Sequence, residues 1–161
     1  MSEVSVALKA LKIAFGSFDE PLNAIYNYPT DTVNVNAGKL LVLRHAKEIQ
    51  SQFQHEAQGV INHTWWCEGL LALHKFTSNQ APPPYPTPDE TAAELLVEDY
   101  LNAIRNTLSA NITLGGIAVM LGDGQVLTDY MVDRFFWSTT EFFGIRFLFK
   151  VEQESVVPIG G

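Results

Sequence analysis

The segment from Phe142 to Glu152 constrains the fold of this chain more than any other part of it. Its sequence, FFGIRFLFKVE, alternates large apolar residues with residues that are mostly small or charged. A two-residue period places successive side chains on opposite faces of a sheet, so the segment 142–154 is predicted to be a strand with one face on a core. The apolar face comprises Phe143, Ile145, Phe147, Phe149 and Val151; the other carries Gly144, Arg146, Lys150 and Glu152, with Leu148.

Two further segments have the spacing of helices. Val4, Leu8, Leu11 and Phe15 recur at steps of three and four, which predicts a helix over 3–15 that ends at Gly16. Thr87-Pro88-Asp89-Glu90 combines a hydroxyl N-cap, a proline at the first helical position and two acids, and so predicts the start of a second helix over 88–110. That helix has an apolar stripe and a plausible stop at Asn111; the stripe is Ala93, Val97, Tyr100, Ile104 and Leu108.

Three other segments are predicted as strands, and a fourth is left open. Residues 39–45, 59–76 and 111–121 are rich in apolar and β-branched residues, with a bulge expected at Gly69. A helix over 68–76 is the competing interpretation of the second of these. After a turn at 122–125, residues 126–137 fit a strand followed by a bend or a short helical turn.

The connections differ in composition. Residues 18–38 are rich in Pro, Asn and Asp, which predicts an irregular segment held by buried Leu22, Ile25, Tyr26 and Tyr28. The Gln-rich stretch 46–59 fits a hairpin tip or a loop. Residues 79–90 hold five of the eight prolines and predict an extended internal linker, with a ligand for aromatic-grooved modules as the alternative. Residues 155–161 are expected to fray.

Together these elements predict one α+β domain over residues 1–161. Short turns between neighbouring strands favour antiparallel pairing, and two helices would cover one face of the sheet. The expected architecture is therefore two-layered, with a mainly antiparallel sheet and both helices packed on the same face.

Charge and composition exclude several classes of function. The net charge is −8, and the basic residues are scattered singly, so neither sequence-reading of nucleic acid nor docking on an anionic membrane is expected. Cys67 is the only cysteine, and the N-terminal residues lack the pattern of a signal peptide. The longest apolar stretch, 112–121, is too short to span a bilayer. We therefore expect a protein made in a cytoplasm.

Few residues in the sequence are candidates for chemistry. His63, Cys67 and His74 provide three zinc-ligand types, but residues four apart on a strand are separated by about 13 Å. We therefore favour histidines at sheet edges and a packed cysteine. The sequence has no nucleophile elbow and no calcium-loop spacing. The prediction is a protein without catalytic residues, metal or cofactor.

Aromatic pairs favour assembly instead. The pairs Trp65-Trp66 and Phe142-Phe143 must each place their two rings on opposite faces of the sheet. If helices cover one face alone, rings on the other face form an apolar patch of the kind that marks an interface. The predicted interface residues are Phe142 and Leu148, together with Gln52, Phe53, Gln54 and His55 of the Gln-rich stretch.

The arrangement resembles the tail terminator (tail-completion) proteins of long-tailed bacteriophages. The features that carry the resemblance are the N-terminal helix, the Tyr-Pro-x-Asp segment at 28–31 before strand Leu40–Leu43, and the long hairpin-like pair ending at 72–74. The capped helix 88–110 follows, and the closing strand 141–151 opens with an aromatic-Gly pair. The Gln-rich and Pro-rich segments have no counterpart in this resemblance.

The resemblance implies a structural virion protein. Members of this family form a ring, typically of six subunits, at the head-proximal end of the tail tube. They stop tube growth, meet the tail-tube protein and the head connector, and let genome DNA pass without specific binding. Another neck or tail subunit, or a module that binds a small ligand or a peptide, is the alternative.

Overall fold

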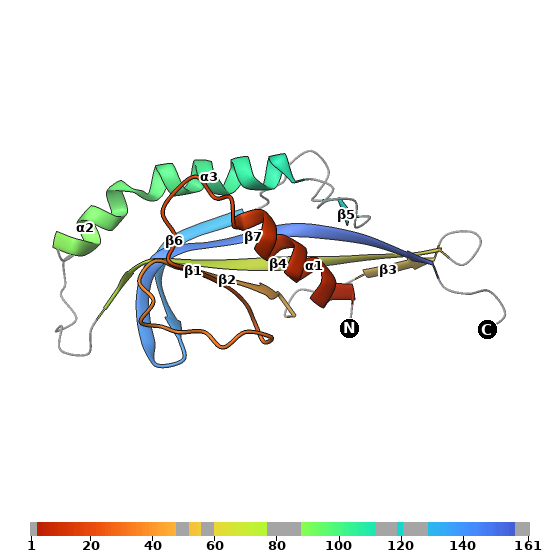
Figure 1. The fold of residues 1–161 in the computed structure, drawn as a ribbon, viewed down its shortest axis with the longest axis horizontal. Coiled ribbons are helices and arrows are strands. Elements are labelled where there is room, and N and C mark those ends of the chain that lie inside the picture. Colours follow the sequence, from red (N-terminus) through yellow and green to blue (C-terminus); the bar gives the residue numbers. More distant parts are fainter. Residues whose placement is uncertain are drawn as a thin grey trace.

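The computed structural model describes residues 3–47, 52–55, 60–76, 88–111, 119–120 and 129–156, and these form an α+β fold around one mostly antiparallel sheet (Figure 1). The predicted fold class is therefore confirmed. The elements are α1 (Glu3–Phe15), β1 (Ala24–Asn27), β2 (Leu40–His45), β3 (Gln52–His55), β4 (Val60–Lys75), α2 (Pro88–Leu95), α3 (Val97–Ala110), β5 (Val119–Met120), β6 (Asp129–Trp137) and β7 (Thr140–Val156).

Two long strands form the centre of the sheet. The strand order is β1-β2-β4-β7-β5, with β3 also paired to β4 and β6 also paired to β7. Only the β1–β2 pair is parallel among these described strands. The β4–β7 ladder runs from Val60 opposite Val156 to Lys75 opposite Phe142. Chain segments far apart in sequence are thus joined along most of the molecule.

The long strand 59–76 is correctly predicted, but its irregularity is not where we expected it. The register shifts between Ala72 and His74 rather than at Gly69, and the competing helix over 68–76 is excluded. Gly69 instead occupies a regular ladder position opposite Phe147. The residue is small there because the ring of Phe147 fills the space beside its Cα.

The helices have the predicted extent but not the predicted continuity. Helix α1 spans the predicted residues, whereas the single helix expected over 88–110 is divided at Leu96 into α2 and α3. The amide of Leu96 donates to the carbonyl of Ala93, a three-residue bond that tightens the chain at this point. Asn111 ends α3 as predicted, and its side-chain amide donates to the carbonyl of Thr107 (2.7 Å). Thr87 lies outside the described residues.

One face of the sheet and the helices share a single hydrophobic core. Figure 1 shows α2 and α3 running along one side of the sheet, and the rings of Phe15 in α1 and Phe147 in β7 are 6.2 Å apart. The alternating residues of the closing strand all enter this core, as predicted. Its buried members include Leu8, Leu11 and Phe15 of α1, Tyr100, Ile104 and Leu108 of α3, and Trp65, Cys67, Phe143, Ile145, Phe147, Phe149 and Val151 of the sheet.

The opposite face carries a second, smaller core. It consists of buried Leu40, Val42, Leu70, Ala72 and Phe142. Val33, Val35 and Ala37, from the segment between β1 and β2, and Phe135 and Trp137 of β6 pack against it. The rings of Phe142 and Phe143 do lie on opposite faces, but the chain itself covers both of them. Because only 1% of Phe142 is exposed, its side chain has no surface for another subunit, and its prediction as an interface residue is wrong.

The connections also differ from expectation. Part of the segment predicted as irregular forms β1, and Tyr28 is exposed rather than buried, with its ring edge-on to Trp137 (5.0 Å). Leu22, Ile25 and Tyr26 are partly buried. Residues 129–137, left open by the sequence, are strand throughout.

Several predictions fall on other parts of the chain. The linker residues 79–87, the turn at 122–125, most of the strand 111–121 and residues 157–161 lie outside the described part. Within the described residues, no helix has both the length and the apolar character needed to cross a bilayer.

Candidate subunit interface

Strand β6 exposes a concentration of apolar side chains. Of the six large apolar residues that are exposed in the described part of the chain, three belong to β6: Tyr130, Met131 and Phe136. Phe136 is 65% exposed and Met131 51% exposed. Among the described strands β6 pairs with β7 alone, so its other edge has no strand partner in that part of the chain. An edge strand with unpaired backbone groups and apolar side chains is a natural place for another chain to bind.

The same strand carries two exposed carboxylates. Asp129 and Asp133 flank Tyr130 and Met131, and each accepts a hydrogen bond from the backbone amide of the residue that follows it (2.8 and 2.7 Å). These bonds fix the carboxylates close to the strand backbone. The exposed part of β6 is therefore an acidic strip with apolar side chains between its charges.

Contacts from other elements hold β6 in place. The guanidinium of Arg105 in α3 lies 5.8 Å from the ring centre of Tyr130, and that of Arg134 lies 4.6 Å from the ring centre of Phe76. Phe135 stacks on Phe142 at 5.9 Å. The strand is thus anchored on both faces of the sheet, which preorganises its outer edge for binding.

Leu148, a predicted interface residue, lies beside this strip. It is half-buried and pairs with Asp129 in the β6–β7 ladder. A shallow hollow of about 70 Å³ opens there, lined by Glu68, Asp129, Tyr130, Met131, Arg146 and Leu148. Within it the buried carboxylate of Glu68 accepts hydrogen bonds from Arg44 (2.6 Å) and Arg146 (2.7 Å). The assignment of Leu148 to an interface stays a prediction; its side chain is partly exposed and can contact another chain.

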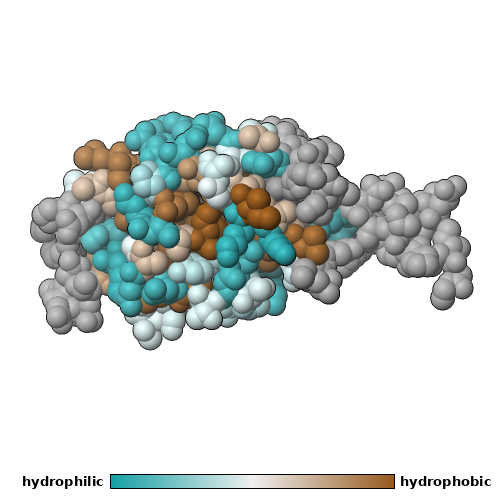
Figure 2. Space-filling view, viewed as in Figure 1, coloured by the Kyte–Doolittle hydropathy of each residue, from teal (hydrophilic) through white to brown (hydrophobic). Residues whose placement is uncertain are grey.

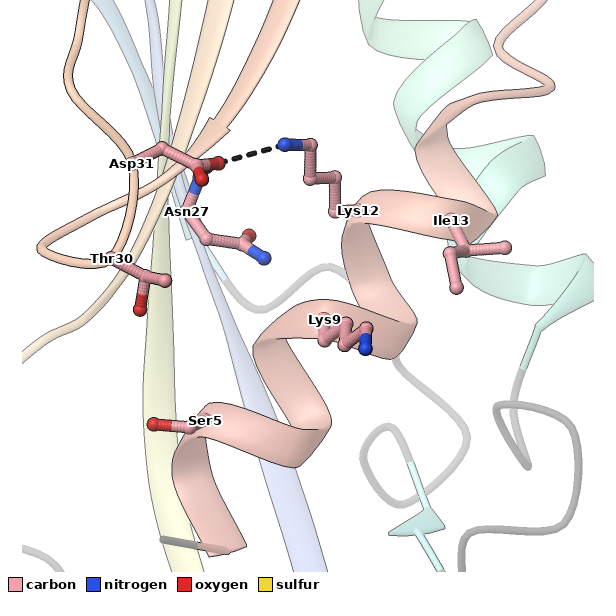
Figure 3. A pocket seen from close by; sticks show the side chains of 7 residues that line it. All are labelled: Ser5, Lys9, Lys12, Ile13, Asn27, Thr30 and Asp31. Carbon is pink, nitrogen blue, oxygen red and sulfur yellow. Dashed lines mark hydrogen bonds and ion pairs between the residues drawn. The ribbon is translucent and has the colours of Figure 1, made fainter. Parts of the chain in front are cut away.

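A larger groove lies between α1 and the end of β1. Its volume is about 610 Å³, and Figure 3 shows α1 on one side and residues 27–31 on the other. It is lined by Ser5, Lys9, Lys12, Ile13, Asn27, Thr30 and Asp31. In Figure 2 apolar atoms are visible among polar ones over the middle of this face, where α1 runs in Figure 1. Ile13, at the rim of the groove, is 72% exposed.

Asp31 links the two sides of this groove. Its Oδ2 accepts a hydrogen bond from the backbone amide of Asn27 (2.8 Å) and one from Nζ of Lys12 (2.8 Å). The hydrogen bond from the Asn27 amide lowers the pKa of this carboxyl most, and the ammonium of Lys12 lowers it further, so the pKa lies below its ordinary value. Lys9, one turn before Lys12, is exposed and has no ion pair with the described residues, so the groove carries a surplus positive charge.

Asn27 is the one residue of the lining that is buried, at 6% exposure. Figure 3 shows its side chain pointing toward α1. Its carboxamide oxygen is buried and accepts no hydrogen bond from the part of the chain that the structure describes. A buried acceptor without a donor is unfavourable by about 1–3 kcal/mol, so this oxygen has much to gain from a donor that enters the groove.

The residues considered as metal ligands have other environments. Cys67 is fully buried, and burial raises the pKa of its thiol, which disfavours a reactive thiolate. Trp65 lies between His63 and Cys67 on the same strand, with its indole N–H donating to Gln153 (2.6 Å). His74 is edge-on to Phe76 (4.9 Å). In the described part of the chain, no three His, Cys, Asp or Glu side chains come together as a metal site would require.

The predicted interface residues Gln52, Phe53, Gln54 and His55 form β3. Their backbone pairs antiparallel with residues 61–64 of β4. Of the two interpretations of the Gln-rich stretch, a hairpin or a loop, these residues fit the hairpin, because they pair antiparallel with the next strand. Their assignment to an interface stays a prediction.

Sequence reasoning missed both surfaces described above. The signal for β6 was the segment DYMVD, where large apolar residues and acids occur without a clean alternation, as suits a strand exposed on an edge.

No protein-family model matches the chain, and no curated protein sequence matches it.

Proposed function

We propose that this protein is a structural subunit that forms a ring at the head-proximal end of a bacteriophage tail, where it ends tube growth and joins the tail to the head connector. The observation that supports this proposal best is β6, an edge strand with exposed apolar side chains. Where such an edge binds a different surface on the next subunit, the contact is head-to-tail, and contacts of that kind close into rings.

The order of elements agrees with the resemblance on which the proposal is based. An N-terminal helix, a Tyr-Pro-x-Asp turn, a long central strand, a helical segment and a long closing strand follow one another along the chain. The net charge of −8 is compatible with a ring through which DNA passes, because a negative lumen repels phosphates.

The test is assembly with and without the tail tube. Purified protein would be measured by light scattering over a wide range of concentrations and imaged by electron microscopy. Tail-tube protein would then be polymerised in its presence. The proposal expects closed rings, on their own or at one end of each tube, and tubes of limited length. A protein that is monomeric at every concentration and leaves tube growth unchanged would contradict it.

The groove between α1 and β1 favours a second candidate, a module that binds a peptide or a small ligand. Its volume of about 610 Å³ lies within the range of ligand sites, and it combines charged, polar and apolar groups. A monomer that binds peptides in this groove without forming rings would support this candidate over the first.

A further inference from the structure

The acidic strip on β6 and the basic groove beside β1 are complementary surfaces at opposite ends of the strand order. Strand β1 begins the order β1-β2-β4-β7, and β6 pairs with β7 at its other end. Three strands separate the two surfaces along the sheet, although the sheet curls so that the rings of Tyr28, after β1, and Trp137, at the end of β6, lie 5.0 Å apart. Within the described residues of one copy, no ion pair joins Asp129 or Asp133 to Lys9 or Lys12, so a second copy can supply that contact.

The two surfaces match in charge. The groove offers the ammonium of Lys9, which has no ion pair within the described residues, and that of Lys12, which Asp31 only partly engages. The strip offers the exposed carboxylates of Asp129 and Asp133. In a chain with 18 acidic and 10 basic residues, copies repel one another unless acidic regions meet a basic one. The groove is such a region.

The groove and the strip also match in their apolar and hydrogen-bonding groups. Ile13 is exposed at the rim of the groove, and Tyr130 and Met131 are exposed between the two aspartates. The buried carboxamide oxygen of Asn27 has no donor among the described residues. The outer edge of β6 has no strand partner among the described strands; there the amides of Tyr130 and Arg134 donate to the neighbouring aspartates. One backbone N–H of an entering strand would satisfy that oxygen.

From this complementarity we propose that β6 of one copy lies in the α1–β1 groove of the next copy, with Asp129 and Asp133 facing Lys9 and Lys12. The inference rests on the proposed function and names the contact that builds the ring. The contact is heterologous, because each copy gives its strip to one neighbour and its groove to the other. No third component is needed at the junction.

Charge reversal tests this contact directly. One variant is Lys9→Glu, which makes the groove acidic; the other is the double variant Asp129→Lys/Asp133→Lys, which makes the strip basic. Each variant alone places like charges at every junction, and we expect its association to weaken at least tenfold. Lys47→Glu, at an exposed residue that does not line the groove, and Glu94→Lys/Glu98→Lys, on the helices, are controls with the same changes in charge.

Mixing the two variants gives the decisive result. In an equimolar mixture, the acidic groove of the first variant meets the basic strip of the second, and the unchanged groove of the second meets the unchanged strip of the first. We expect assembly to return in the mixture, with the two chains alternating, measured by light-scattering mass and by native mass spectrometry. A contact between two identical surfaces would contain only one of the two mutated sites, so one of the two variants alone would not weaken it.

The outcomes separate this inference from the function. If wild-type rings form and neither variant weakens them more than its control does, the contact is wrong and the ring proposal stands. If the variants weaken association and the mixture restores it, but the assemblies do not act on tail tubes, the contact stands and the function is wrong. A wild type that never associates overturns both.

Discussion

Gly69 of β4 lies directly opposite Phe147 of β7, and the ring of Phe147 occupies the space that a side chain at residue 69 would need. A Cβ built on Gly69 would lie 2.1 Å from the ring carbon Cζ of Phe147. That ring also contacts Phe15 of α1 and Phe149, at centroid distances of 6.2 and 6.0 Å. The glycine thus lets a helix, two strands and an aromatic cluster meet at one point of the core.

We therefore expect Gly69→Ala to destabilise the protein by about 1–3 kcal/mol, although alanine suits a strand better than glycine does. The ring has to move in a close-packed core, and this cost exceeds the gain in strand propensity. Denaturant unfolding would measure the loss. The double variant Gly69→Ala/Phe147→Leu should lose less than the sum of the two single variants, because the smaller side chain makes room; simple additivity would contradict the explanation.

The alternating closing strand could be predicted because its signal is local. One-sided burial imposes a two-residue period, and Phe143 to Val151 show it without interruption. Asn111 and the extent of α1 were likewise predictable, since helix ends and apolar stripes depend on neighbouring residues. The division at Leu96 was not, because the apolar stripe continues through it.

The covering of Phe142 and the formation of β1 depend on distant residues. Pro, Asn and Asp around residues 24–27 indicate an irregular segment, yet these residues are ordered by a parallel ladder with β2. Phe142 was predicted to lie on an uncovered face because both predicted helices were assigned to the opposite face of the sheet. Val33, Val35 and Trp137 cover it instead, and nothing in their local sequence indicates this. The groove with Asn27 arises in the same way, from the approach of α1 to β1.

Phe142 and Phe136 should respond oppositely to substitution. We expect Phe142→Ala to cost about 3–5 kcal/mol of unfolding free energy and Phe142→Asp to unfold the domain, because the side chain is buried in the second core. Phe136→Ser should change stability by no more than about 0.5 kcal/mol, since that ring is largely exposed. Thermal unfolding of the three variants checks both statements. A folded Phe142→Asp protein would show that this face is not packed as described.

Cys67 should be unreactive in the folded protein. The thiolate is the reacting form, and burial both raises the pKa of the thiol and blocks access to it. Reaction with an aromatic disulfide reagent should therefore proceed only as fast as the protein opens, and should reach one thiol per chain in denaturant. Fast labelling under native conditions, with unchanged circular dichroism, would contradict the burial of this residue.

Asp31 should make the α1–β1 contact sensitive to acid. Its pKa is lower in the folded state than its ordinary value of 3.8, so its contribution to stability is fully present above that pH and is lost as the pH falls through the folded-state pKa. Asp31→Asn should cost about 0.5–1 kcal/mol at neutral pH, because solvent screens the pair with Lys12. The difference between wild type and variant should shrink below pH 3.8. Asp19→Asn, at an exposed carboxyl, is the control; a difference that persists in strong acid would refute this account.

Asn27 offers a way to separate folding from assembly. Leucine has nearly the same shape as asparagine, and in the isolated subunit Asn27→Leu removes a buried carboxamide oxygen that has no donor among the described residues. We expect the variant to be more stable than the wild type by about 1 kcal/mol, as measured by denaturant unfolding under conditions that keep the protein monomeric. If that oxygen accepts a hydrogen bond from a backbone N–H of a neighbour's β6, the same variant should associate more weakly, by a factor of about ten.

Thr30→Val, at an exposed residue of the same groove, serves as the control, because it alters the lining without touching a buried acceptor. A variant that gains stability and keeps full association would mean that the oxygen of Asn27 takes no part in the contact. A loss of both properties would mean that the carboxamide has a structural role in the monomer.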